Sequence, residues 1–160
     1  MKNLTMLVLL MLGAFCNAQK KLPNLSLSNL EGKNVSLEKD FAEKDKLYVF
    51  AFWATWCAPC IEELNEIENV YADWKSELNV EVVAVSIDDS RTVKRVKPLV
   101  NGKGWEYVVL YDSNQDFKRA LGISNPPYIA VVKNGEIIYT QNGHTPGSEV
   151  ELFEKLKTLK

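Results

Sequence analysis

The chain has 160 residues, of which 46% are hydrophobic and 25% charged, and its formal net charge is −2. This length is typical of one domain plus, at most, a short targeting segment. The basic residues are dispersed and the charge balance is mildly acidic, so the composition argues against a nucleic-acid partner.

The first 18 residues have the pattern of a secretory signal peptide. Lys2 supplies the positive start, residues 4–15 supply the apolar run, and Cys16-Asn17-Ala18 is a small-residue cleavage site. The apolar run is short for a membrane span. We therefore expect export to the periplasm with cleavage after Ala18. The alternative is a lipoprotein anchored through Cys16, which the bulky Phe15 makes less suitable.

Cleavage leaves residues 19–160 as one domain, and the loss of Lys2 changes the net charge from −2 to −3. Of the three cysteines only Cys57 and Cys60 then remain. An exported chain with a single cysteine pair is not a disulfide scaffold, which favours a catalytic role for the pair.

The segment before the main pattern predicts a small extension. Residues 25–37 alternate loosely around Gly32-Lys33, which is typical of a short hairpin. A poorly ordered leader is the alternative. Residues 38–46 are charged and predict one helical turn followed by a loop.

The main pattern runs from residue 47 to residue 78. Residues 47–53 are continuously apolar, as in a strand buried on both faces of a parallel sheet. Cys57-Ala58-Pro59-Cys60 follows this strand. Beyond it, apolar residues recur at the three- and four-residue steps of a helix, namely Ile61, Leu64, Ile67, Val70, Tyr71, Trp74 and Leu78.

The position of the cysteines, where strand becomes helix, favours redox chemistry. Unpaired N–H groups and the helix dipole stabilise a thiolate at a helix N-terminus. Pro59 fits the first turn. Residues three apart on a helix have Cα atoms about 5 Å apart, within the range of a disulfide. We expect Cys57, nearer the helix tip, to be the attacking sulfur and Cys60 to resolve the mixed disulfide.

The motif Trp56-Cys-Ala-Pro-Cys60 after an aromatic strand resembles the thioredoxin superfamily. With Glu63 it is most similar to secreted thiol–disulfide oxidoreductases of the TlpA/ResA type. The resemblance covers roughly residue 25 to the end and implies a redox-active Cys57–Cys60 disulfide. Two alternatives remain: half of a zinc site, or a structural disulfide, although a bond across so short a loop restrains the unfolded chain little.

The next segments predict a β-α-β unit and a second helix. Residues 80–87 are an apolar run that should pair in parallel with residues 47–53. Asp88-Asp89-Ser90 offers N-cap residues, and Pro98 should kink or end the helix that follows. A basic cluster lies along this helix, either as a solvated face or as a docking patch for an acidic partner: Arg91, Lys94, Arg95 and Lys97.

The last third of the chain predicts an extended segment at 105–111, a short helix, a hairpin and a final helix. Residues 112–114 can cap the short helix, which Gly122 closes. Asn134-Gly135 is a strong hairpin signal. Ser148 and Glu151 form a capping box for a last helix with Val150, Phe153, Leu156 and Leu159 inward. This order predicts an α/β, thioredoxin-like fold: a central mixed sheet with helices on both faces and a short N-terminal hairpin extension.

Ile123-Ser-Asn-Pro-Pro127 precedes the first hairpin strand, where the superfamily has a cis-proline facing the cysteines. The resemblance places Pro127 there, with an ordinary trans turn as the alternative. Relatives usually have a residue with an N–H before this proline, and that N–H pairs with an extended substrate. Pro126 has none, so substrate contacts should depend more on side chains such as Trp56 and Tyr128.

Glu63 stands one helical turn after Cys60. Thioredoxins often hold a buried acid in the preceding strand, but Ala51 occupies that position here. In TlpA/ResA-type proteins a glutamate at the Glu63 position serves the cavity near the cysteines, which implies a proton acceptor for Cys60. The alternative is a solvated glutamate beside Glu62.

Two further side chains, Trp56 and His144, are expected to be exposed. An exposed Trp56 would offer an apolar contact to a partner protein, and burial in the core is its alternative. His144 is expected on the surface, without a chemical role.

These features predict an exported thiol–disulfide oxidoreductase that reduces protein disulfides. Such a reductase needs recharging by a membrane electron carrier. We expect a monomer with no organic cofactor and no metal. The target stays open among cytochrome c maturation, repair of wrongly oxidised proteins and general disulfide reduction.

Two other functions are alternatives to disulfide reduction. A thioredoxin-fold peroxidase would have a Pro-x-x-x-Thr-x-x-Cys pattern, but Thr55 is two residues before Cys57 and Ala51 stands in place of the proline. A copper-handling chaperone would need a further histidine and a different cysteine spacing.

Overall fold

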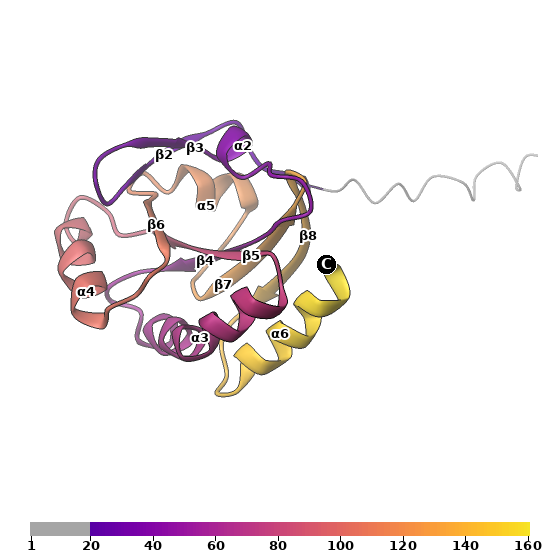
Figure 1. Cartoon of the computed structure of the whole chain (residues 1–160). Coiled ribbons are helices and arrows are strands. Elements are labelled where there is room, and N and C mark those ends of the chain that lie inside the picture. Colours follow the sequence, from indigo (N-terminus) through magenta and orange to yellow (C-terminus); the bar gives the residue numbers. More distant parts are fainter. Residues whose placement is uncertain (1–19) are drawn as a thin grey trace, which may run out of the picture.

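A computed structural model describes residues 20–160 of the chain (Figure 1). The predicted signal peptide, its cleavage site and Cys16 lie outside the described residues. The helices and strands in chain order are β1 (Lys20–Lys21), β2 (Ser26–Asn29), β3 (Asn34–Ser36), α2 (Leu37–Asp40), β4 (Leu47–Trp53), α3 (Ala58–Glu77), β5 (Val80–Ser86), η1 (Val93–Arg95), α4 (Val96–Lys103), β6 (Val108–Tyr111), α5 (Asp116–Leu121), β7 (Tyr128–Lys133), β8 (Glu136–Asn142) and α6 (Ser148–Leu159).

The strands form one mixed sheet in the order β1-β8-β7-β4-β5-β6-β2-β3. β4 lies in the middle, parallel to β5 and antiparallel to β7. Every residue of β4 is buried, which is why this strand reads as an unbroken apolar run. The predicted α/β fold is confirmed, and the expected N-terminal hairpin is present as β2 and β3, which extend the sheet beyond β6.

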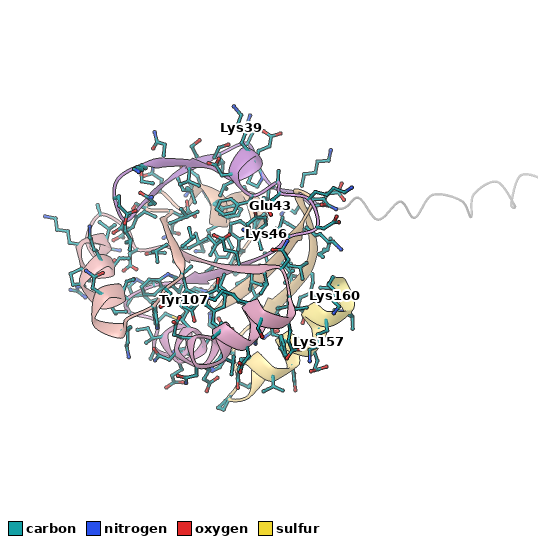
Figure 2. The ribbon with its side chains drawn as sticks, viewed as in Figure 1. Lys39, Glu43, Lys46, Tyr107, Lys157 and Lys160 are labelled. Carbon is teal, nitrogen blue, oxygen red and sulfur yellow. A yellow bond between two sulfur atoms is a disulfide. The ribbon has the colours of Figure 1, made fainter. Side chains whose placement is uncertain are left out.

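Helices cover both faces of the sheet: α3 and α6 lie on one side, and α2 and α5 lie on the other (Figure 1). Aromatic contacts hold these layers. Phe117 of α5 packs on Phe52 of β4, with ring centroids 5.0 Å apart. Trp74 of α3 stacks on Phe153 of α6 at 5.6 Å. Lys157 of α6 reaches Glu77 of α3 at 3.4 Å, and Figure 2 shows Lys157 on α6.

For the segment after β5, the expected cap is wrong, and of the two expectations for Pro98 the ending of the helix is excluded. Asp88-Asp89-Ser90 does not cap α4, because the one-turn 3-10 helix η1 intervenes and α4 begins only at Val96. Pro98 does not end α4 either, since the helix continues to Lys103. Pro98 is its third residue, and in the first turn a missing N–H removes no essential helical hydrogen bond. The basic cluster of Arg91, Lys94, Arg95 and Lys97 is exposed, as both of its interpretations require.

Two expectations for α6 are also wrong. The N-cap of α6 is Gly147 rather than Ser148, and no capping box forms. Val150 is 58% exposed, whereas Leu152 and Leu156 are buried. At about 100° per residue Val150 lies about 200° from Leu152 and about 120° from Leu156 around the helix, so it faces away from the buried side.

Candidate active site

The two cysteines lie at the N-terminus of α3 and are joined by a disulfide, with Cα atoms 5.3 Å apart. Cys57 is the N-cap residue and Pro59 lies in the first turn. The Cys57 N–H donates to the Ala54 carbonyl at 3.0 Å, which closes the turn between β4 and α3.

The two sulfurs differ in access. Cys57 is 6% exposed, whereas Cys60 is completely buried. Trp56, next to Cys57, is 57% exposed, so its core alternative is wrong. An incoming disulfide can therefore approach Cys57 beside an exposed indole, while Cys60 is reachable only from within.

The proline segment lies at the same end of the sheet as the cysteines. Phe52, near the end of β4, pairs with Tyr128 at the start of β7, which brings Pro127 beside the turn that carries Cys57. The Pro126–Pro127 bond is cis, so the trans alternative is wrong. The Pro127 carbonyl accepts a hydrogen bond from the Gly143 N–H at 2.9 Å. The half-buried Tyr128 packs against Phe52 with ring centroids 6.1 Å apart.

Glu63 is only 3% exposed, so the alternative of a solvated helix residue is wrong. Its pKa is raised from 4.5 to about 8, first because burial penalises the carboxylate and second because Glu66 adds a like charge. A carboxyl group in this range exchanges its proton near neutral pH. Ala51 is buried in β4 and supplies no acid there.

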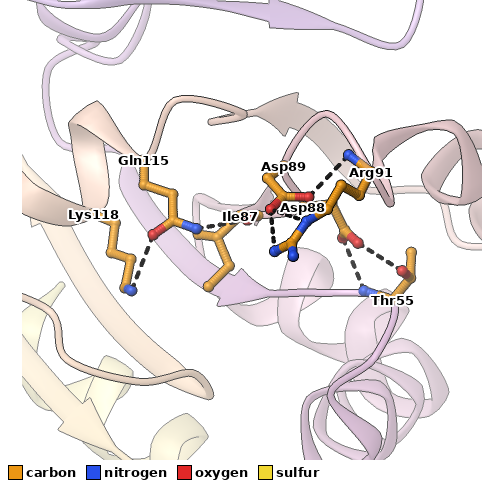
Figure 3. Close-up of polar contacts among 7 residues, drawn as sticks. All are labelled: Thr55, Ile87, Asp88, Asp89, Arg91, Gln115 and Lys118. Atoms are coloured by element: carbon orange, nitrogen blue, oxygen red, sulfur yellow. Dashed lines mark hydrogen bonds and ion pairs between the residues drawn. The ribbon is translucent and has the colours of Figure 1, made fainter.

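A second buried acid, Asp88, lies directly beyond β5 and contacts the turn that precedes Cys57. Its carboxylate accepts hydrogen bonds from the Thr55 N–H at 2.8 Å and the Thr55 hydroxyl at 2.6 Å (Figure 3). The Ser86 hydroxyl donates a third at 2.9 Å. The sequence indicates only a helix cap at Asp88, because its partner Thr55 lies 33 residues away.

His144 is not on the surface, which corrects the expectation for it: its side chain is 2% exposed. Its Nδ1 lies 3.0 Å from the Ser148 hydroxyl, and its Nε2 lies 3.4 Å from Oε2 of Glu66 on α3. His144 follows Gly143, the residue bonded to Pro127. The loop before α6 thus joins the proline segment to the helix that carries Glu63.

Desolvation and the carboxylate of Glu149 raise the pKa of Glu66, and the imidazole of His144 opposes that shift.

Within residues 20–160 no group of three or more acidic, cysteine or histidine side chains is arranged to hold a metal ion. Over that same range, no helix is long and apolar enough to cross a membrane.

Comparisons with known proteins agree with this geometry. The Redoxin family matches residues 17–156. The chain is 31% identical over 137 residues to the thiol-disulfide oxidoreductase ResA of Bacillus anthracis, covering 85% of this chain and 76% of that protein. ResA of Oceanobacillus iheyensis is 36% identical over 114 residues, covering 71% of this chain and 51% of that protein.

Solved structures give the same fold. An uncharacterized thioredoxin-like protein from Porphyromonas gingivalis is 47% identical, with a TM-score of 0.74 over 86% of this chain and 90% of that one. A thiol-disulfide oxidoreductase from Bacteroides fragilis is 20% identical, with a TM-score of 0.71 over 88% of this chain and 100% of that one. The chain therefore belongs to the Redoxin family, as a TlpA/ResA-like thiol–disulfide oxidoreductase of the thioredoxin superfamily.

Proposed function

We propose that this oxidoreductase reduces disulfides in other proteins, with Cys57 as the attacking sulfur and Cys60 as the resolving sulfur. The observation that carries the assignment is the difference in access between the two: Cys57 is 6% exposed beside the exposed Trp56, and Cys60 is 0% exposed. A target disulfide can then reach only the first sulfur.

The reaction moves two electrons from the reduced cysteine pair to the target. The Cys57 thiolate attacks one target sulfur, breaks the target disulfide and releases one target thiolate, leaving a mixed disulfide. Cys60 gives up its proton and attacks the Cys57 sulfur. The second target sulfur leaves as a thiolate, both target thiolates take up protons, and the Cys57–Cys60 disulfide remains.

Glu63 is proposed as the group that takes the Cys60 proton. Its pKa of about 8 is close to the ordinary thiol value of about 8.5, so the transfer costs little free energy in either direction. When an electron donor reopens the disulfide, protonated Glu63 returns the proton to the leaving Cys60 sulfur. One carboxyl group thus serves both halves of the cycle.

The substrate groove is proposed to lie between Trp56 and the segment from Pro126 to Tyr128. An extended substrate can pair with backbone beside the cis-proline, in the manner of strand addition. Pro126 has no N–H to donate, so this pairing has one hydrogen bond fewer. Side-chain contacts at Trp56 and Tyr128 would then contribute more of the selectivity.

We also propose that residues 1–18 direct export to the periplasm and that residues 19–160 form the mature, monomeric domain. Attachment through Cys16 is the alternative for the N-terminus. A membrane electron carrier would return the pair to the reduced state. Cytochrome c maturation is one pathway that could use such a reductase.

Trapping tests the proposal. Cys60→Ser removes the resolving sulfur, so mixed disulfides between Cys57 and exported proteins should accumulate and should disappear on adding dithiothreitol. Cys57→Ser and the double variant are matched controls and should trap nothing. If Cys60→Ser traps no protein, or Cys57→Ser traps as much, the assigned substrates or roles are wrong.

A further inference from the structure

The turn that presents Cys57 is held by a carboxylate from the segment that follows β5. Asp88 is completely buried. Its two oxygens accept hydrogen bonds from both the backbone and the side chain of Thr55 (Figure 3). The hydroxyl of Ser86 donates a third hydrogen bond. Three donors therefore converge on one carboxylate beside the active-site turn.

The surrounding backbone makes this contact part of a continuous structure. The Ile87 N–H donates to the Trp53 carbonyl at 2.9 Å, which extends the pairing of β5 with β4 to the base of the turn. Thr55 follows two residues later, and Cys57 two residues after that. Without Asp88, the Thr55 N–H and hydroxyl would lose their partner inside the protein, which is costly for buried groups.

No cation neutralises Asp88 within the part of the chain that the structure describes. The adjacent Asp89 is paired instead, with Arg91 at 2.6 Å, and Asp89 is partly exposed. The charge of Asp88 is therefore balanced by hydrogen bonds alone. Asp88 contacts Thr55, which stands two residues before Cys57, and a nearby negative charge opposes ionisation of a thiol.

We propose that Asp88 is a positioning residue for Cys57, which fixes the Thr55–Trp56 turn and, through its charge, makes the Cys57–Cys60 pair more reducing. This inference rests on the proposed role of Cys57 as the attacking sulfur. Asp88 touches no substrate and acts only through Thr55 and the field at Cys57.

The first test separates the charge from the shape. Asp88→Asn keeps the size and a carbonyl acceptor but removes the charge, and Asp89→Asn is the matched control on the adjacent residue. Each purified protein is equilibrated with reduced and oxidised glutathione, and the fraction of Cys57–Cys60 disulfide is measured. Asp88→Asn should shift the equilibrium constant about tenfold toward the dithiol, or about 30 mV toward a more oxidising pair. Asp89→Asn should match the wild type.

The second test addresses the turn itself. Thr55→Val removes the hydroxyl donor at nearly constant volume, whereas Thr55→Ser keeps it. The rate of Cys57 alkylation is measured at a pH where the thiol is fully ionised, so that a change in pKa does not contribute. Thr55→Val should be alkylated severalfold faster than the wild type, because Cys57 is only 6% exposed and a released turn gives the reagent more access to its sulfur, and Thr55→Ser should restore the wild-type rate.

Neither readout requires a protein substrate, so failure of the proposed reductase activity would not affect them. Equal equilibrium constants for Asp88→Asn, Asp89→Asn and wild type would overturn the role of the charge. Equal alkylation rates for Thr55→Val and Thr55→Ser would overturn the role of the anchor. Should Asp88→Asn fail to fold, by circular dichroism, the Thr55 pair alone decides the proposal.

Discussion

Two buried acids stand close to the same disulfide in opposite surroundings. Asp88, on the β5 side, accepts hydrogen bonds from Thr55 and Ser86. Glu63, one turn beyond Cys60 on α3, is also buried, but within residues 20–160 no hydrogen-bond donor pairs with its carboxyl group, which faces the charge of Glu66. Both carboxyl groups are buried, and they differ in the hydrogen bonds that they accept.

This difference shows how one chemical group can serve two purposes within one site. Hydrogen bonds to a carboxylate stabilise its charged form, whereas burial without them favours the protonated form. Asp88 is accordingly suited to hold a turn. Glu63, with a pKa of about 8, is suited to carry a proton.

The largest expected effect concerns the proton carrier. Glu63→Gln should lower turnover by about 10²–10⁴-fold, the usual value of general acid–base help. The wild-type rate should rise as Glu63 ionises near pH 8, and the variant should lose that part of its pH–rate profile. Turnover with a disulfide substrate across this pH range checks both.

Glu62→Gln is the matched control, because Glu62 is an exposed glutamate on the same helix. Its pH–rate profile should equal that of the wild type. An unchanged profile in Glu63→Gln would remove the proton carrier from the mechanism and with it the contrast with Asp88.

A second prediction concerns stability. The pKa of Glu63 lies near 8 in the folded protein, whereas its ordinary value is 4.5. The contribution of this shift to the free energy of unfolding is therefore fully present below pH 4.5 and is lost as pH rises through 8. Glu63→Gln does not titrate, so its free energy of unfolding does not fall for this reason. Its stability relative to the wild type should rise over that range by at most about 5 kcal/mol.

Urea unfolding of the oxidised proteins at several pH values measures this difference. Glu62→Gln should show no such trend. A constant difference between Glu63→Gln and wild type at all pH values would mean that the pKa of Glu63 is the same in the folded and the unfolded chain.

A third, smaller effect isolates the substrate groove from both acids. Pro126→Thr restores an N–H beside Pro127, and a hydrogen bond contributes about 0.5–1.5 kcal/mol net. The apparent KM for a generic disulfide substrate such as insulin should fall by about two- to tenfold, with the pH–rate profile unchanged. A KM that stays the same or rises would show that Pro126 does not limit substrate pairing.

The sheet and its helices can be predicted from the sequence because their patterns are local. The change from the continuous apolar run of β4 to the helical period of α3 marks both elements. The errors occur at helix starts. Asp88 and Ser148 have side chains typical of caps, but each contacts a residue outside the helix that it was expected to cap, Thr55 and His144 respectively. A cap motif does not reveal a competing tertiary partner.

The candidate site also contains residues that the sequence predicts and residues that only the packing identifies. The cysteine motif and Pro127 are recognisable in single short segments. The sequence alone leaves Glu63 and Glu62 equivalent in type, and only packing shows that Glu63 is the buried one. The contact of His144 with Glu66 has no sequence signal, except that Glu66 stands one turn after Glu63.

That contact leads to the smallest predicted effect. Glu66 raises the pKa of Glu63 as the second cause after burial, so Glu66→Gln should lower the pKa of Glu63 from about 8 while leaving it above 4.5. His144→Gln should act one step further out: it removes the group that opposes the raised pKa of Glu66, which should rise. Carbon-13 NMR titration of labelled glutamate carboxyl groups in the oxidised protein measures both, with Glu63→Gln identifying the Glu63 signal. Glu62→Gln should leave the Glu63 titration unchanged, because Glu62 does not contribute to that shift. If Glu66→Gln also leaves it unchanged, burial alone raises the pKa of Glu63, and the cluster around His144 serves only to fasten the loop before α6 to α3.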